Sequence, residues 1–111
     1  MRIFASSKTT AKATPEALRD DMDAEVAVGK RLFEQGLIVQ AYMDPNYTDT
    51  YMILEAASIA DAKVAFDTYP LVRAGLIVYE FTSVVGMPAV AQSLQERNQP
   101  LPEWWPADPD S

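Results

Sequence analysis

The chain has 111 residues, of which 49% are hydrophobic and 23% are charged, the balance of one globular domain. Its net charge of -7 argues against nucleic acid, which is bound through a basic surface, and against anionic lipid, which it would repel. Cysteine and histidine are both absent, which excludes disulfides, thiolate chemistry and the commonest general base and metal ligand. We expect no metal site.

The first residues, MRIFASSKTT, lack the long apolar core of a signal peptide, and no apolar run approaches membrane-spanning length. We therefore expect a cytoplasmic protein with no membrane partner and no nucleic-acid partner. The expected partners are a small apolar or weakly acidic molecule and a second copy of the chain, as a homodimer or a higher homo-oligomer.

A strand and a helix are the first predicted elements. Arg2 to Lys8 mixes apolar and hydroxyl side chains, which favours a short strand. Thr14-Pro15-Glu16 is typical of a helix start, because Thr caps well, Pro is favoured at the first helical position and an acid suits the first turn. Gly36 is the expected C-cap, and residues spaced by three and four predict the buried stripe of the helix: Leu18, Met22, Val26, Gly29 and Phe33.

A hairpin and a second helix follow. Leu37 to Met43 and Tyr51 to Ala57 are the expected strands, joined by the turn formers DPNYTD. Ser58 is the expected cap of a helix whose Ala62, Ala65 and Phe66 face inward.

The segment TYPLVRAGLIVYEF returns this helix to the sheet. Pro70 helps to end the helix, and residues 70–75 form a link in which Gly75 supplies a backbone angle that other residues resist. Leu76 to Val84 is the last strand, expected beside the first. The order β-α-β-β-α-β over residues 1–85 is the ferredoxin-like α+β unit, a four-stranded antiparallel sheet with helices on one face.

The predicted hairpin register gives the sheet two different faces. If Tyr42 faces Tyr51, then Gln40 faces Ile53 and Ile38 faces Glu55. One face is then apolar and suits helix packing: Leu37, Val39, Ala41, Met43, Met52, Leu54 and Ala56. The other face carries too much aromatic and branched surface to be left in water. We expect two such sheets to face each other as a dimeric α+β barrel, with a small pocket in each subunit.

Two segments resemble a known family. AEVAVGKRLFEQGLI and LEAASIADAKVAFDTYPLVRAGLIVYEFTSV are similar to the muconolactone-isomerase-like family of dimeric α+β barrels, over roughly residues 2–85. The resemblance implies proton transfer on a small unsaturated lactone without a cofactor. Two features depart from the family: Val39-Gln40 stands where relatives often carry an Arg-Glu pair, and the absence of histidine separates the chain from related barrels that use a His-Asp pair.

Two carboxylates fall at family-like positions, and each has two interpretations. Glu25 lies at the edge of the helix stripe, where partial burial would raise its pKa toward that of a useful base; alternatively it is a solvated residue that pairs with Lys30. Glu55 lies on the face assigned to the cavity, either as the proton carrier or as the partner of an arginine such as Arg73.

The remaining candidates are hydrogen-bond donors and cavity walls. Tyr42 and Tyr51 would stabilise an enolate oxygen, or else pack across the strands at the dimer seam. Arg73 would neutralise a ligand carboxylate, or else be structural. Which of Tyr79 and Glu80 faces the cavity stays open, and the methionines 22, 43 and 52 are expected in the core. The expected substrate-binding residues are Gln40, Ile38, Ile53, Arg73, Trp104 and Trp105.

Residues 86–111 extend beyond the family core. MPAVAQSLQERNQ predicts a short third helix that starts near Pro88, and the proline-broken PLPEWWPADPDS cannot be regular. At least one of Trp104 and Trp105 must pack on a surface, either a groove of the partner subunit, which we favour, or the mouth of the pocket as a lid. We expect mobility from Pro106 onward.

Three functions are compatible with these features. The first is a cofactor-independent enzyme that isomerises, or moves a proton on, an unsaturated lactone, enone or polyketide-like ring. The second is a non-catalytic binding or oligomerising module. The third is a cofactor-free antibiotic-biosynthesis-type monooxygenase, because the same barrel hosts such enzymes; the fold alone does not choose among them.

Overall fold

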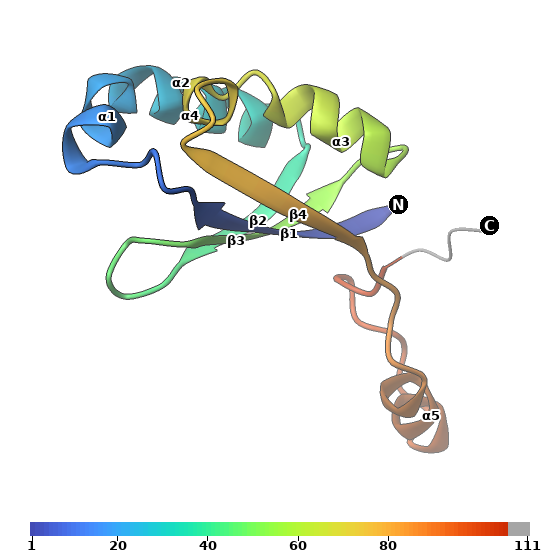
Figure 1. Ribbon diagram of the computed structural model, residues 1–111. Coiled ribbons are helices and arrows are strands. Elements are labelled where there is room, and N and C mark those ends of the chain that lie inside the picture. Colours follow the sequence, from blue (N-terminus) through green and yellow to red (C-terminus); the bar gives the residue numbers. More distant parts are fainter. Residues whose placement is uncertain (107–111) are drawn as a thin grey trace.

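The chain folds around a single antiparallel sheet whose strands lie in the order β2-β3-β1-β4 (Figure 1). The computed structural model describes residues 1–106. Its elements, in chain order, are β1 Arg2–Thr9, α1 Pro15–Asp20, α2 Met22–Glu34, β2 Ile38–Met43, β3 Thr50–Glu55, α3 Ile59–Phe66, α4 Pro70–Arg73, β4 Ile77–Ser83 and α5 Pro88–Glu96.

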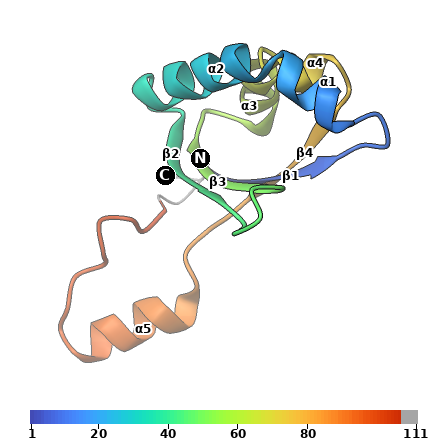
Figure 2. The same cartoon turned by 90° about the vertical axis from the view of Figure 1, so that its left-hand side faces the viewer.

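The layers of the molecule confirm the predicted ferredoxin-like α+β fold. The helices α1 to α4 lie on one side of the sheet, and β4 pairs beside β1 as expected (Figures 1 and 2). Within residues 1–106, no helix layer covers the other face of the sheet, which is called here the open face. The C-terminal arm, defined as residues 84–106 and containing α5, leaves the end of β4 on that side.

Both predicted helix caps are confirmed. The hydroxyl of Thr14 accepts a hydrogen bond from the Ala17 N–H at 3.2 Å, and the hydroxyl of Ser58 accepts one from the Asp61 N–H at 3.0 Å. Each hydroxyl pairs an N–H that has no partner inside the first turn of its helix, and these bonds fix where the helices begin.

The first helix differs from its prediction, because it is broken into α1 and α2 at Asp21, whose φ of -111° and ψ of 12° are not helical. The expected buried stripe is also shifted. Leu32 is the core residue of α2, whereas Phe33 is 61% exposed. Met22 and Met43 lie partly exposed rather than in the core, and of the three methionines only Met52 is buried.

The link after α3 contains a further turn of helix. Pro70 occupies the first turn of α4, where its missing N–H costs nothing, so it starts a helix rather than only ending one. Gly75 follows with a φ of +74°, and Gly36 has +84° after α2, which confirms that both positions need a left-handed backbone. The chain therefore reverses tightly from the helix layer into β4.

A β-bulge in β2 changes the predicted hairpin register. Tyr42 pairs with Tyr51 and Gln40 with Ile53 as expected, but Ile38 pairs with Leu54 rather than with Glu55. Val39 is the extra residue of the bulge, and the side chains before it are turned to the opposite face. The prediction that Ile38 lines the open face is therefore wrong: it is buried among the helices, and Val39 is exposed.

The core lies between the sheet and the helix layer. Phe66, Leu54 and Ile3 are its largest fully buried side chains together with Leu71. Ala62 and Phe66 face inward as predicted, and Ala65 packs partly buried against the same cluster. The buried cluster consists of Ile3, Ala5, Leu32, Ile38, Met52, Leu54, Ala62, Phe66 and Tyr69.

The predicted third helix is confirmed as α5, whose first residue is Pro88. Trp105 is half-buried and Trp104 is exposed. Mobility is expected from Pro106 onward, and of these residues 107–111 lie outside the described part of the chain.

Candidate functional site

A cavity of about 320 Å³, called here the inner cavity, lies between α2 and the helix-covered face of the sheet. Its position follows from the fold, because α2 carries Glu25 and Gly29 one helical turn apart and therefore on one face. Helix residues, the hairpin and β4 all contribute walls. The lining consists of Met22, Glu25, Val26, Gly29, Ala41, Tyr42, Met43, Thr50, Met52, Tyr69, Leu71, Ile77 and Tyr79.

Glu25 presents a half-buried carboxylate to this cavity. Its Oε1 accepts a hydrogen bond from the Leu71 N–H at 3.1 Å, which joins α2 to the first turn of α4. Burial raises the pKa of the Glu25 carboxyl above its ordinary value of 4.5; the Leu71 hydrogen bond lowers the pKa, and the charge of Asp21 raises it further. A carboxylate whose pKa is raised in this way is a better base than a solvated one.

Two tyrosines from different elements lie near Glu25 on the cavity wall. Burial raises the pKa of Tyr79 to about 12, the charge of Glu25 adds to the rise, and the side chain of Thr50 acts in the opposite direction. Burial likewise raises the pKa of Tyr69, with Tyr79 and Glu25 adding to the effect. Both phenols therefore stay protonated at neutral pH, and each can donate a hydrogen bond.

Gly29 lets Tyr69 approach the helix. A Cβ atom at position 29 would lie 3.4 Å from the Tyr69 hydroxyl, so the hydroxyl packs directly over the part of α2 that follows Glu25. The rings of Tyr69 and Tyr79 stack with their centroids 6.2 Å apart, and Phe66 packs edge-on against both, at 5.3 Å and 4.8 Å. This packing fixes the orientation of the two phenol groups.

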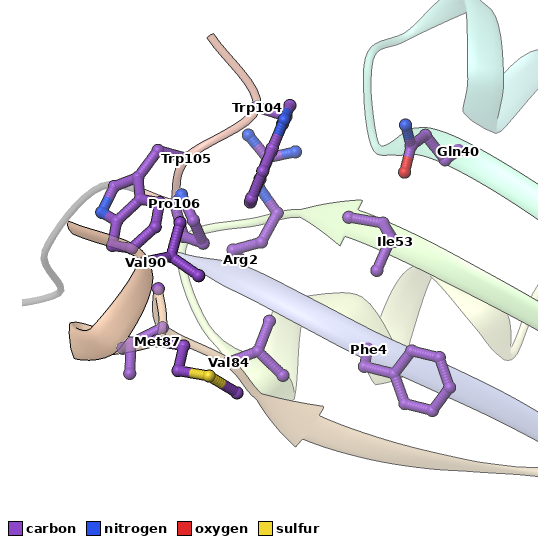
Figure 3. Close-up of a pocket in the computed structure, with 12 residues that line it drawn as sticks. Arg2, Phe4, Gln40, Ile53, Val84, Met87, Val90, Trp104, Trp105 and Pro106 are labelled. Carbon is purple, nitrogen blue, oxygen red and sulfur yellow. The ribbon is translucent and has the colours of Figure 1, made fainter. Parts of the chain in front are cut away.

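A second and larger cavity of about 650 Å³, called here the outer cavity, lies between the open face and the C-terminal arm. Figure 3 shows Phe4 and Ile53 on the sheet side and Trp104 and Trp105 on the arm side. The walls are mainly apolar. The lining consists of Arg2, Phe4, Gln40, Ile53, Val84, Val85, Gly86, Met87, Val90, Trp104, Trp105 and Pro106.

Glu55 forms an ion pair at one end of the open face. Its Oε2 lies 3.1 Å from Arg2 Nε, and its Oε1 lies 3.1 Å from the amino group of Met1. The Arg2 contact is close in distance but does not have the geometry of a hydrogen bond. Glu55 is therefore paired with Arg2 and with the amino group of Met1, which donates a hydrogen bond to it, rather than with Arg73.

The structure divides the predicted site residues between the two faces of the sheet. Glu25 borders the inner cavity, whereas Gln40, Ile53, Trp104 and Trp105 border the outer one. Tyr42 touches the rim of the inner cavity, but it pairs with Tyr51 and its side chain therefore lies on the open face. Tyr51 lies on the open face, where it stacks with Phe4 at 6.5 Å, and Glu55 lies on the same face. Arg73 is exposed in the last turn of α4. Glu25 and Glu55 therefore do not belong to one site.

Sequence reasoning missed Tyr69 and left Tyr79 undecided. Tyr79 pairs with Ser7, and both face the helices, whereas its neighbour Glu80 faces the open side. Tyr69 precedes Pro70, which holds residue 69 in an extended conformation with φ -67° and ψ 125°. The Tyr-Pro step was the available signal, since it directs a large side chain inward just before α4.

Among residues 1–106, no group of three or more histidine, cysteine, aspartate or glutamate side chains is arranged to hold a metal ion. In the same described part of the chain, no helix has both the length and the apolar character needed to cross a membrane.

Comparisons with known proteins identify the fold. No family model matches the chain, and no curated protein matches it in sequence. Among solved structures, the chain is similar to 5-chloro-2-hydroxyhydroquinone dehydrochlorinase (TftG) from Burkholderia phenoliruptrix AC1100, in complex with 2,5-dihydroxybenzoquinone. The TM-score is 0.63, with 17% identical residues, over 80% of this chain and 98% of that one. At this identity the match shows a common fold and supports the sequence resemblance at that level.

Proposed function

We propose that the chain is a cofactor-independent enzyme that moves a proton on a small unsaturated ring bound in the inner cavity. The observation that carries the proposal is Glu25, a carboxylate with a raised pKa on the wall of a cavity that two protonated phenols share. We further infer a relationship to the muconolactone-isomerase-like family, which the fold of TftG and the segment from Pro70 to Ile77 support.

The proposed chemistry uses residues of this chain alone. The Glu25 carboxylate takes a proton from a carbon next to a carbonyl group, and the electron pair of that C–H bond passes to the carbonyl oxygen as an enolate. The phenol of Tyr69 or Tyr79 donates a hydrogen bond to this oxygen, where negative charge develops. Glu25 then returns the proton to another carbon of the conjugated ring, so that the double bond moves and no atom is gained or lost.

The walls of the cavity define the substrate class. Its volume lies near the lower end of the ~300–1,000 Å³ typical of ligand pockets, which suits a molecule of one or two rings. A ligand carboxylate beside Glu25 would place two like charges in a partly desolvated space, which is costly. We therefore propose a neutral ring with a carbonyl or hydroxyl group, such as an enone, an unsubstituted lactone or a polyketide-like ring. The ring bound in the TftG structure, 2,5-dihydroxybenzoquinone, is of similar size.

Deuterium exchange tests this proposal. The protein is incubated in deuterated water with cyclohexenone or with an unsubstituted butenolide, and exchange at carbon is followed by NMR. We expect protein-dependent exchange into at least one ring, and its loss in Glu25→Gln. Exchange that is lost in Glu55→Gln and retained in Glu25→Gln would assign the base to Glu55. Binding of a ring without exchange would indicate a binding module rather than an enzyme.

A further inference from the structure

The inner cavity opens to solvent between apolar side chains. Of the residues that line it, Met22, Val26 and Met43 are between 42% and 49% exposed. Tyr69 and Leu71 line the same cavity and are buried. The three exposed residues therefore border the opening, which is called here the apolar mouth, and the two buried residues border the closed end.

The fold brings the three residues of the apolar mouth together. Met22 and Val26 lie one turn apart on one face of α2. The chain turns at Gly36 directly from α2 into β2, and 13 helical residues cover about the same length, ~20 Å, as the six residues of this strand. Met43 at the end of β2 therefore returns to the level at which α2 begins, as Figure 1 shows for the hairpin and the start of α2. Met43 pairs with Thr50, which also lines the cavity.

The polar groups of the cavity lie away from the first turn of α2. Glu25 is half-buried and accepts its hydrogen bond from the Leu71 N–H at the closed end. The Tyr69 hydroxyl packs over Gly29, which follows Met22 by seven residues and therefore lies about 10 Å further along the helix axis. A bound ring that places its carbonyl oxygen beside the phenols thus has its opposite side directed toward the apolar mouth.

The chemistry of the apolar mouth favours an apolar substituent on that ring. Among the described residues, Glu25 is the one charged member of the lining, so a charged substituent would find no counter-ion at the mouth. A bare ring held beside Glu25 would leave the side chains of Met22 and Met43 in water. An alkyl or aryl group would cover them, and methionine side chains are flexible enough to pack against apolar groups of different shape.

We propose that the substrate of the inner cavity is a carbonyl ring that carries an apolar substituent, which Met22, Val26 and Met43 bind at the mouth. This inference rests on the proposed function and narrows its substrate class. The three side chains contact a part of the substrate that is remote from the reacting atoms. They therefore bind the ground state and the transition state equally, which lowers KM without raising kcat.

A series of alkylated rings tests the proposal. The wild type is assayed by deuterium exchange with cyclohexenone and with its 5-methyl, 5-propyl and 5-pentyl derivatives. The alkyl group is then attached to a carbon that is adjacent neither to the carbonyl group nor to the double bond. Each methylene that leaves water at the apolar mouth should lower KM by up to about fourfold, whereas kcat should stay the same.

Two variants make the same chemical change at different sites. Gln has nearly the shape of Met, but its amide group loses hydrogen bonds to water when an alkyl group covers it. Met43→Gln should therefore lower the ratio of kcat/KM between the 5-pentyl ring and the bare ring by about tenfold. Met87→Gln alters an exposed residue of the C-terminal arm, on the other side of the sheet, and should keep the wild-type ratio. Circular dichroism checks that both variants are folded.

Several outcomes would overturn this assignment. The first is a KM that does not fall with alkyl length, and the second is an equal ratio in Met43→Gln and Met87→Gln. Rejection of the 5-pentyl ring by a protein that exchanges the bare ring would show that this end of the cavity is closed. Failure of the proposed function differs, because then no ring exchanges at all. Calorimetric Kd values of the same series, for the wild type and Met43→Gln, would in that case decide whether the substituent binds at the mouth.

Discussion

Glu25 Oε1 accepts a hydrogen bond from the Leu71 N–H at 3.1 Å, across 46 positions of the chain. The bond joins the proposed base to α4, the helical turn inside the link that returns the chain to β4. The abrupt reversal at Tyr-Pro therefore does more than connect two elements. It places Tyr69 over Gly29, supplies a backbone donor to Glu25 and delivers the chain to the strand that carries Tyr79.

The hydrogen bond between the Leu71 N–H and Glu25 leads to a prediction about stability. Glu25→Ala leaves the Leu71 N–H without its acceptor, and a lost hydrogen bond of this kind costs about 1 kcal/mol of unfolding free energy. Glu25→Gln keeps a side-chain oxygen of the same reach, so its loss should be smaller. Urea denaturation of both variants measures the difference. Equal unfolding free energies for Glu25→Ala and the wild type would show that the bond contributes nothing.

The raised pKa of Glu25 predicts how stability changes with pH. Ionisation is harder in the folded protein than in the unfolded chain, so the carboxyl favours the folded state fully at low pH. This contribution is lost as the pH rises from the unfolded value of Glu25 through its higher folded value. Relative to Glu25→Gln, the wild type should therefore lose stability over that window and change no further above it. Melting temperatures of both proteins, measured across this pH window, check the direction of the change. If the wild type instead gains stability relative to Glu25→Gln as the pH rises, the pKa of Glu25 is lowered in the folded protein.

The two phenols of the inner cavity lead to a prediction about turnover. Tyr79→Phe removes a donor from the wall of the inner cavity without changing its packing, and the loss of such a donor to a developing oxyanion typically lowers turnover about a hundredfold. Tyr47→Phe is the matched control, because Tyr47 lies 79% exposed in the β2–β3 loop. Steady-state exchange rates of the two variants compare them. Equal loss in both would argue against a specific role for Tyr79.

Two substitutions of Gly29 are expected to separate stability from binding of the ring. Gly29→Ala should raise the unfolding free energy by up to about 1 kcal/mol, because Ala is the better helix former and its Cβ only reaches contact distance from the Tyr69 hydroxyl. Gly29→Leu should fill the inner cavity and abolish ring binding in calorimetry. If Gly29→Leu binds the ring as the wild type does, the ligand lies elsewhere.

The sequence predicted the arrangement of the elements well, because the signals involved are local. Thr14 and Ser58 mark helix starts by hydrogen bonds within one turn, and Gly36 and Gly75 mark positions that need a positive φ. The failures lie where tertiary structure decides. The Val39 bulge inserts one residue into an otherwise regular alternation, and it moved Ile38 from the open face to the core.

The site was harder to predict than the fold, because its parts come from distant segments. The position of Glu25 on a helix edge is a local signal, but Tyr69 and Tyr79 meet it only through the packing of α4 and β4 against α2. Glu55 was assigned to a cavity on the correct face of the sheet, yet that face is opposite Glu25, and Arg2 pairs with it there. No local sequence pattern distinguishes a carboxylate that forms an ion pair from one that acts as a general base.

The most direct test of the proposed function is the rate of deuterium uptake into the exchanging ring, measured by NMR for the wild type, Glu25→Gln and Glu34→Gln. The last variant makes the same chemical change at an exposed position of the same helix. We predict that Glu25→Gln slows exchange by about a hundredfold or more, since a general base typically contributes at least that factor, and that Glu34→Gln exchanges as the wild type does. Wild-type exchange in a folded Glu25→Gln protein would contradict the assignment of Glu25 as the base.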